Sequence, residues 1–548
     1  MRTPVSTGPG LAGFAVFWLL LLGALPMLRL AVEAGSAGAW AELAQDAAVW
    51  RAARRSLVVA AGATALSVTL GVALAALLLL REVPGRRVLI FLAVLPLLVP
   101  PQIMALGFLQ AAGPGSPLLL ALGLAPPIGS AHPLHGPLGM VLVLGVQGAP
   151  LVFLGVAALV RRIPGETLIA ARGLGASPGG ALRRVAWPLL LPGLAAGAGL
   201  AWIAALGNFG VAALIGIPGR YPVLTVLIWR RLGQGGPEAL GEVALLSVLL
   251  AGLALPGLAI QRFAARAAPL PTGRPFAPMP LRLRGAGTAV AMVYLLVVLG
   301  LPMLSLLLAA LVPAIGVRLT AATFTLANFA AALAPGAQTG AAFGRSLVLS
   351  GVAALVLAAA AGAIALAQSH RSVRLAGVMA DLPYALPGAC IGVAAILIVL
   401  SLPGGGALYG TAGLILIAYL SRFQALALRP AAAAAARLDP ALDLAARGMG
   451  AGPLRRIAAI HLPLLAPALG AGAILVMLLA VNEVTVSALL HGPGSQTLGV
   501  LVFNLQDSGS TALAAAVSCL ALLLVAVLMA LASLAARRLP AGTLPWRP

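Results

Sequence analysis

The chain contains no lysine, so all 34 of its basic side chains are arginines. A P-loop nucleotide site needs a lysine that reaches the β- and γ-phosphates, so this absence excludes ATP hydrolysis by that route. Acidic residues number only 12, and we find no cluster of acids, bases or nucleophiles typical of a membrane enzyme. The two cysteines, Cys390 and Cys519, lie in apolar runs without metal-ligand spacing. We therefore predict no disulfide framework, no metal site and no cofactor.

Hydrophobic residues make up 61% of the chain and charged residues 8%, with a mean hydropathy of +1.09. This is more apolar surface than a water-soluble core can bury, so we predict an all-α integral membrane protein. The first apolar run resembles a signal peptide in position, but it is about twenty residues long and we read it as an uncleaved span. Twelve apolar runs are long enough to cross a membrane: 11–32, 56–80, 88–112, 138–160, 187–216, 240–261, 286–313, 346–368, 376–401, 411–430, 462–490 and 511–535.

The distribution of arginine predicts the orientation of these spans. With the amino terminus in the cytoplasm, 25 of the 34 arginines fall in cytoplasmic segments, and the even number of spans places both termini there. The net charge of +22 is then an orientation signal, and no nucleic-acid partner is predicted. Arginines 51, 54, 55 and 345 precede spans that enter from the outer face. We expect them to lie at the membrane interface with their charged heads in water.

A short polar pattern occurs twice, as A-A-R-G-L-G at 170–175 and A-A-R-G-M-G at 445–450. A proline follows each pattern thirteen residues after its last glycine, and every position is displaced by 275 residues. A second motif, L-P-x-x-x-P, occurs at 95–100 and 382–387, and its prolines are expected to bend the third span of each half. The repeats predict two homologous six-helix halves, 1–262 and 286–548, joined by a proline- and arginine-rich cytoplasmic linker at 263–285.

Both repeated loops, about 161–188 and 431–463, fall on the cytoplasmic side between the fourth and fifth spans of their halves. The alanines allow close approach of another helix, and the last glycine allows a sharp change of backbone direction. The basic amphipathic stretch that follows is too short to fold alone and cannot enter lipid. We expect it to dock against a protein.

The repeated pattern resembles the EAA loop of permease subunits of type I ABC importers. Two such loops on one chain resemble the fused permeases of the ferric-iron, thiamine and related importers. The chain departs from the family where the glutamate of E-A-A is expected, because Ile169 and Leu444 occupy those positions. The residues that carry the resemblance are Ala170, Ala171, Arg172, Gly175 and Pro188 in the first loop and Ala445, Ala446, Arg447, Gly450 and Pro463 in the second.

The resemblance implies a partner for each loop. In the family this loop is a coupling helix that sits in a groove of a separate ATP-binding subunit. The chain would then bind two copies of that subunit on the cytoplasmic side and an extracytoplasmic solute-binding protein on the other. It would be a multi-pass protein of the bacterial cytoplasmic (inner) membrane, with no ATPase site of its own.

Two polar residues at membrane depth, Asn208 and Glu483, lie 275 residues apart in the fifth spans. A glutamate inside a span is expected to face the bundle interior or water. Three interpretations stay open for Glu483: it lines the translocation pathway, it makes a buried structural contact with Asn208 or a helix end, or it contacts the binding protein near the outer surface. Another acidic residue near a span, Asp381, is expected to pair with Arg371 or Arg374.

The solute is less well defined than the architecture. The segment N-F-G-V-A-A-L-I-G-I-P-G-R-Y at 208–221 favours ferric iron, with thiamine, polyamine and phosphonate as alternatives. A secondary, proton-coupled transporter with two six-helix halves would also have twelve spans. That alternative gives no reason for matching loops after both fourth spans.

Overall fold

The computed structural model describes residues 9–36, 40–79, 83–127, 129–160, 163, 165–235, 239–266 and 286–535. Within these ranges the chain is helical and contains no strand, which confirms the predicted all-α fold class. Eleven described helices are long and apolar enough to cross a membrane, and a bent pair, Arg371–Ala385 and Gly388–Leu400, makes twelve if it counts as one span. Most of the predicted linker, 267–285, lies outside the described residues.

The α-helices of the first half are α1 (Pro9–Leu19), α2 (Leu25–Ser36), α3 (Trp40–Gln45), α4 (Ala47–Leu78), α5 (Arg86–Val94), α6 (Pro101–Ala112), α7 (Pro117–Leu122), α8 (Pro137–Val160), α9 (Gly165–Gly173), α10 (Pro178–Ala181), α11 (Trp187–Gly207), α12 (Phe209–Val211), α13 (Leu224–Gln234) and α14 (Ala239–Arg266).

Those of the second half are α15 (Ala286–Leu295), α16 (Leu301–Ala310), α17 (Ala327–Leu333), α18 (Gln338–Ala367), α19 (Arg371–Ala376), α20 (Leu382–Ala385), α21 (Gly388–Leu400), α22 (Ala412–Ala435), α23 (Pro440–Gly448), α24 (Pro453–Arg456), α25 (Leu462–Val481), α26 (Thr485–Leu490), α27 (Leu498–Asp507) and α28 (Thr511–Ala535). Three short 3₁₀ segments are η2 (Leu95–Leu97), η6 (Gly377–Ala380) and η7 (Gly405–Leu408).

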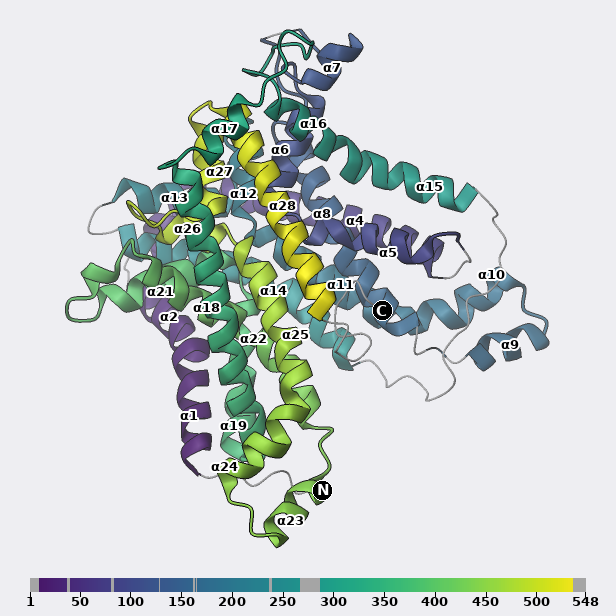
Figure 1. Ribbon diagram of the computed structural model, residues 1–548, viewed down its shortest axis with the longest axis vertical. Helices are drawn as coiled ribbons and strands as arrows, with labels where there is room; N and C mark the ends of the chain where they lie inside the picture. The colour runs from purple at the N-terminus through teal and green to yellow at the C-terminus, as the bar shows by residue number, and fades with distance from the viewer. Residues whose placement is uncertain are drawn as a thin grey trace.

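The two halves repeat one order of elements. Helices α8 to α14 correspond one by one to α22 to α28, which confirms the duplication predicted from the repeated motifs. In Figure 1, α9 and α10 lie at the end of one arm of helices, and α23 and α24 lie at the end of another. The repeated loops are therefore separate in space, one on each arm.

The third span of each half breaks at its L-P-x-x-x-P motif. In the first half α5, η2 and α6 replace the single run predicted at 88–112, and Pro100 precedes the first residue of α6. In the second half the chain bends by 112° between α20 and α21. Proline lacks the N–H that a continuous helix needs, which explains why both helices end at these positions.

The fifth spans are also interrupted, whereas the sequence predicted continuous runs at 187–216 and 462–490. Helix α11 ends at Gly207 and α12 begins at Phe209; α25 ends at Val481 and α26 begins at Thr485. Short helices α13 and α27 follow each interruption, and their apolar faces are buried. Helices α13 and α27 lie in stretches that the sequence left as connections between spans, because each is too short to cross a membrane.

Proline also sets the positions of the π-helical turns. The carbonyl four residues before a proline loses its usual donor, so the nearest N–H that can reach it lies five residues away. Each of the five π turns among the described residues ends two residues before a proline: η1 (Leu20–Ala24) before Pro26, η3 (Leu182–Ala186) before Pro188, η4 (Ala212–Gly216) before Pro218, η5 (Leu296–Gly300) before Pro302 and η8 (Ile457–His461) before Pro463.

The two halves exchange their first spans. Helix α1 packs against α18 and α2 against α21, while α16 packs against α6. One hydrophobic cluster accordingly joins Leu306 and Ala309 of the second half to Ile103 and Met104 of the first. Each half therefore buries part of its apolar surface against the other, in addition to the packing within each half.

A repeated R-S-L tripeptide ties each second span to the loop before α13 or α27. The buried hydroxyl of Ser56 accepts a hydrogen bond from Leu224 N at 2.9 Å, and that of Ser346 accepts one from Leu498 N at 2.8 Å. These are the first residues of α13 and α27. Both serines therefore satisfy a backbone donor that the helix itself leaves unpaired.

The arginines of the same tripeptides contact those loops. Arg55 donates to the carbonyl oxygen of Arg220 at 3.3 Å and lies 4.5 Å from the centre of the Tyr221 ring. Arg345 donates through Nε to the carbonyl oxygen of Gln496 at 2.9 Å. Both arginines therefore fasten a loop as well, which the sequence did not predict. Arg54 is exposed, as expected.

We predict that Ser56→Ala and Ser346→Ala each lower the stability of the protein. Each change leaves a buried backbone N–H without an acceptor, which costs about 1–3 kcal/mol. Thermal unfolding in detergent should show a lower transition temperature for both variants. Ser508→Ala is the matched control, because its hydroxyl is exposed and bonds locally to Leu505 O. Unfolding of the Ser56 and Ser346 variants at the wild-type temperature would contradict this role.

Candidate functional site

Each repeated loop contains a short helix, α9 or α23, that ends in the same backbone motif. Gly175 and Gly450 adopt positive φ angles of 89° and 76°, in the left-handed region that favours glycine. The residue after each glycine donates back across the helix end, as in a Schellman motif. These bonds are Ala176 N to Ala171 O at 3.0 Å and Ala451 N to Ala446 O at 2.9 Å. The pattern A-A-R-G-x-G therefore encodes a helix stop.

The outer faces of these two helices are apolar and exposed. Ile169 and Leu444, which replace the family's glutamate, are 70% and 62% exposed. The residues before the last glycines, Leu174 and Met449, are 89% and 80% exposed. Ala170 and Ala445 are exposed as well, whereas Ala171 and Ala446 turn toward the protein. Large exposed apolar side chains that recur at matching positions mark a surface for another protein.

A basic connector leads from each loop into the fifth span. In the first half it comprises α10 and η3, and in the second α24 and η8. Pro188 and Pro463 lie near the start of α11 and α25 and are exposed. Because each proline places a π turn just before it, the connector and the span join with the same geometry in both halves.

In the second loop, a buried cluster of ionic side chains links α23 to the connector that follows it. The Asp443 side chain is 5% exposed and accepts from Arg456 Nη1 at 2.6 Å and from His461 Nε2 at 3.2 Å, while Arg447 Nη2 lies 2.8 Å from its other oxygen. Burial alone would raise the pKa of Asp443, but the hydrogen bonds from His461 and Arg456 and the charges of both arginines lower it below its usual range.

The first loop has no counterpart of this cluster among its described residues. The positions 275 residues before Arg456 and His461 are Ala181 and Ala186, and both are buried. Arg172 matches Arg447 and is exposed. Helix α23 is thus tied electrostatically to its connector, whereas α9 rests on apolar contacts.

A cavity of about 250 Å³ lies where the broken spans of the two halves meet. Both residues predicted for the pathway, Asn208 and Glu483, line it. Its other walls come mainly from the two L-P-x-x-x-P breaks and from α22: Leu97, Val99, Pro101, Gln102, Tyr384, Leu386, Pro387, Arg422 and Asn482 are among them. Non-helical backbone at this depth is tolerated because it is enclosed by protein and lines a cavity.

Asn208 and Glu483 share one structural role. The side chain of Asn208 accepts from Val211 N at 2.9 Å, and that of Glu483 accepts from Val486 N at 3.0 Å. Each thereby caps the helix that resumes after the break, α12 or α26. A helix end was among the contacts considered for Glu483. The structure shows this contact and no bond between Glu483 and Asn208.

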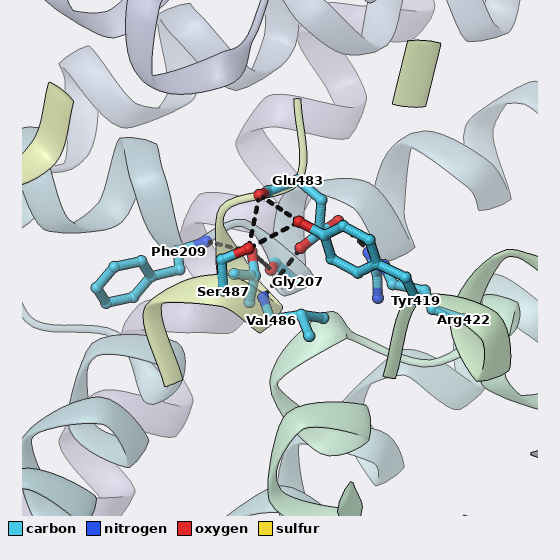
Figure 2. Close-up of polar contacts among 8 residues, drawn as sticks. Gly207, Phe209, Tyr419, Arg422, Glu483, Val486 and Ser487 are labelled. Atoms are coloured by element: carbon cyan, nitrogen blue, oxygen red, sulfur yellow. Dashed lines mark hydrogen bonds and ion pairs between the residues drawn. The ribbon is translucent and has the colours of Figure 1, made fainter. Parts of the chain in front are cut away.

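Glu483 also forms an ion pair that the sequence analysis missed. Its second oxygen lies 3.1 Å from Nε of Arg422 on α22, 61 residues earlier in the chain. The Tyr419 hydroxyl, one turn before Arg422, donates to the carbonyl oxygen of Glu483 at 3.3 Å and lies 2.7 Å from the Ser487 hydroxyl (Figure 2). Helix α22 therefore holds the break before α26 in place through two side chains.

The same segment joins the two halves. The hydroxyl of Thr485 donates to the carbonyl oxygen of Gly207 at 3.3 Å and accepts from Phe209 N at 3.4 Å. Figure 2 shows Gly207 and Phe209 beside the Glu483 to Ser487 segment. The two interruptions of the fifth spans are therefore in direct contact at the wall of the cavity.

Two arginine assignments from the sequence are wrong. The 25 arginines assigned to cytoplasmic segments include Arg422, but Arg422 lies within α22 and lines the cavity. Asp381 pairs with Arg429 at 3.0 Å, rather than with Arg371 or Arg374. The repeat offset could have identified Arg422, because the position 275 residues earlier is Gln147, a polar residue inside the fourth span.

In the described part of the chain, no group of three or more His, Cys, Asp or Glu residues is placed to hold a metal ion.

Comparisons with known proteins agree with this architecture. The family model described as "Binding-protein-dependent transport system inner membrane component" matches residues 67–268 and again 354–541. The chain is 31% identical over 516 residues to the "Probable ABC transporter permease protein y4fN" of Sinorhizobium fredii, covering 90% of this chain and 89% of the relative.

Shorter matches carry names that include a solute. A probable molybdenum ABC transporter permease protein of Haloferax volcanii is 31% identical over 43% of this chain and 82% of its own length. The thiamine transport system permease protein ThiP of Brucella abortus is 28% identical over 41% of this chain and 42% of its own length. With two copies of the family domain on one chain, this protein belongs to the inner-membrane permease components of binding-protein-dependent ABC transport systems.

Proposed function

We propose that this chain is the complete membrane pathway of an ATP-driven importer for a solute delivered by an extracytoplasmic binding protein. The observation that carries the proposal is the pair of matched helix stops on separate arms, each with exposed apolar side chains beside it. An ordinary helix connector has no reason to repeat a left-handed glycine, a Schellman bond and a π turn at one constant offset.

Each loop receives one ATP-binding subunit on the cytoplasmic side, and those subunits hydrolyse the ATP. The contact is mainly apolar in this chain, since Ile169 and Leu444 stand where the related loops carry glutamate. Both termini and both loops are placed in the cytoplasm by the arginine distribution. An extracytoplasmic binding protein selects the solute and delivers it to the opposite face.

Closure of the two ATP-binding subunits would draw the two loops together and shift the arms between two arrangements. A shift of this kind requires contacts that differ between the two states. The halves meet at the breaks beside Gly207 and Thr485, which is where a change in the angle of the arms would reshape the cavity. The exchanged first spans keep the halves assembled throughout.

Ferric iron is the solute favoured by segment 208–221, with the solutes named for the relatives, molybdenum and thiamine, as alternatives beside polyamine and phosphonate. The one carboxylate on the described cavity wall, Glu483, is already paired with Arg422, and the described residues offer no group of ligands for a bare metal ion. Iron would therefore cross with a small anion bound to it. The competing function is a proton-coupled secondary transporter, which would not need an ATP-binding subunit.

We predict that Gly175→Val and Gly450→Val uncouple transport from ATP hydrolysis. A β-branched residue is strained at a positive φ angle by about 1–2 kcal/mol, so the helix stop and the apolar contact beside it should shift. Solute uptake by cells that also express the ATP-binding subunit and binding protein should fall at least about tenfold, while the purified complex continues to hydrolyse ATP.

Gly173→Ala and Gly448→Ala are the matched controls. Both glycines lie in helical turns with open space around the position of a Cβ atom, so alanine should leave coupling intact. Uptake driven by a proton gradient, in a chain that purifies without any ATP-binding subunit, would contradict the proposed function.

We predict that Asp443→Asn loosens the second loop and not the first. The lowered pKa of Asp443 means that its ion pairs stabilise the loop above the ordinary carboxyl pKa and are lost as pH falls below it. At neutral pH the asparagine variant should exchange backbone amides in 440–461 about tenfold faster or more. Hydrogen exchange with mass spectrometry measures this directly.

Glu166→Gln is the control for the Asp443 variant. Glu166 lies in the first turn of α9 and is exposed, so its replacement should leave exchange in both loops unchanged. Wild-type exchange in 440–461 should accelerate only when the pH falls below the ordinary range of a carboxyl group. Equal acceleration in both loops of the Asp443 variant would show that the cluster has no local role.

A further inference from the structure

We propose that the central cavity admits a small anionic solute, an oxyanion such as a phosphonate or a carboxylate, and that Arg422 is the residue that binds it. Glu483 then competes with the solute for the guanidinium of Arg422. This inference rests on the proposed function and adds the chemical class of the solute. It follows from the distribution of charges and free donors on the cavity wall.

Charge on the wall is confined to one ion pair. Of the described residues that line the cavity, Arg422 and Glu483 alone carry a charge. The remaining wall is made of aliphatic and aromatic side chains, three amide side chains and one threonine. A cationic solute could therefore pair only with Glu483, and an anionic solute only with Arg422.

Glu483 is the less available partner. Both of its carboxylate oxygens are engaged, one by Val486 N at 3.0 Å and the other by Arg422 Nε at 3.1 Å. The Val486 bond is a cap that α26 needs, because the first N–H groups of a helix have no partner inside it. Only 10% of the Glu483 side chain is exposed. A cation would have to displace a structural bond to reach it.

Arg422 is the more available partner. A guanidinium has five N–H donors in a planar fork that matches the two oxygens of an oxyanion. The bond to Glu483 uses Nε. Nη1 is buried against Gly388 without a hydrogen-bond partner, and Nη2, which is not buried, has none either among the described residues. The Arg422 side chain is 19% exposed, about twice as exposed as its partner. A solute oxyanion can bind through donors that the ion pair leaves unused.

The neutral polar groups on the wall add free donors beside the guanidinium. Asn208 uses its carbonyl oxygen to accept from Val211 N, so its amino group is the end left for a solute. The Tyr384 hydroxyl and the Gln102 amide also have no hydrogen-bond partner within the described structure. The free acceptors, the amide oxygens of Asn482 and Gln102, are uncharged. The one free group on this wall that carries a full charge is therefore the guanidinium of Arg422.

The first half shows that the fold does not require the ion pair. The positions 275 residues before Arg422 and Glu483 are Gln147 and Asn208, both neutral. Asn208 makes the same cap as Glu483, and Gln147 donates to a backbone carbonyl, Val99 O, at 3.3 Å. A buried ion pair is weak evidence for added stability. The charges of the second half are therefore better explained by the solute than by the fold.

The test measures binding to the purified full chain in lipid nanodiscs, without an ATP-binding subunit or a binding protein. Methylphosphonate and molybdate serve as anionic probes, and thiamine and spermidine as cationic probes. The concentration dependence of the unfolding temperature gives an apparent Kd for each probe. We expect both anions to raise the unfolding temperature and neither cation to do so.

Three variants localise the effect. The Arg422→Gln, Glu483→Asn double variant copies the neutral pair of the first half and retains a capping side chain, and it should lose anion binding by roughly tenfold or more. Glu483→Gln frees the guanidinium and should tighten anion binding by about tenfold. The exposed-residue variant Glu166→Gln should bind the anions as the wild type does.

Three results would overturn the inference: stabilisation by thiamine or spermidine that Glu483→Gln abolishes, anion binding that the double variant retains, or no effect of any probe on the wild type. The unfolding temperature of the double variant without probe reports whether it has folded. If that variant fails to fold, the Glu483→Gln variant alone decides, since tighter anion binding supports the inference and unchanged binding contradicts it. ATP-driven uptake by the assembled importer is measured separately, so the proposed function can survive any of these results.

Discussion

The requirement that every backbone N–H and C=O group be paired within the membrane governs this structure. Four of its membrane segments are interrupted, at the two L-P-x-x-x-P motifs and at the two fifth spans. Interruptions of this kind are tolerated only where side chains or other protein segments satisfy the freed groups. Asn208 and Glu483 supply those partners for α12 and α26. The interruptions therefore gather at one place, and the cavity lies among them.

The duplicated halves share geometry and differ in charge. The helix stops at Gly175 and Gly450, the π turns before Pro188 and Pro463 and the two helix caps occur in both halves. At the cavity and the loops, the ion pairs among the described residues belong to the second half: Arg422 with Glu483 at the cavity, and the cluster around Asp443 at the loop. At the matching positions the first half has neutral side chains, apart from the arginine at 172. The proposed motion of the arms thus rests on features common to both halves, and the proposed selectivity rests on features of one half.

Much of the fold could be predicted from the sequence because hydrophobic length and repeated motifs are local signals. The spans, the duplication and the glycine stops all follow from patterns within a few tens of residues. The breaks at Asn208 and Glu483 were missed as breaks, since a polar residue inside an apolar run does not by itself reveal a lost helical turn. The partner of Glu483 was also missed, because Arg422 lies on another helix and the positive-inside count placed it in the cytoplasm. Pairing across helices is set by packing, which the sequence of one chain does not display.

The most direct test of the proposal that each repeated loop binds one ATP-binding subunit is the mass of the intact assembly. Native mass spectrometry of the complex, purified through a tag on this chain with its ATP-binding subunit co-expressed, should give one copy of this chain with two ATP-binding subunits. The mass should fall to that of the chain with one such subunit when either loop loses its exposed apolar pair, Ile169 with Leu174 or Leu444 with Met449. A complex that contains two copies of this chain, or one that keeps two ATP-binding subunits after both pairs are replaced by serine, would contradict it.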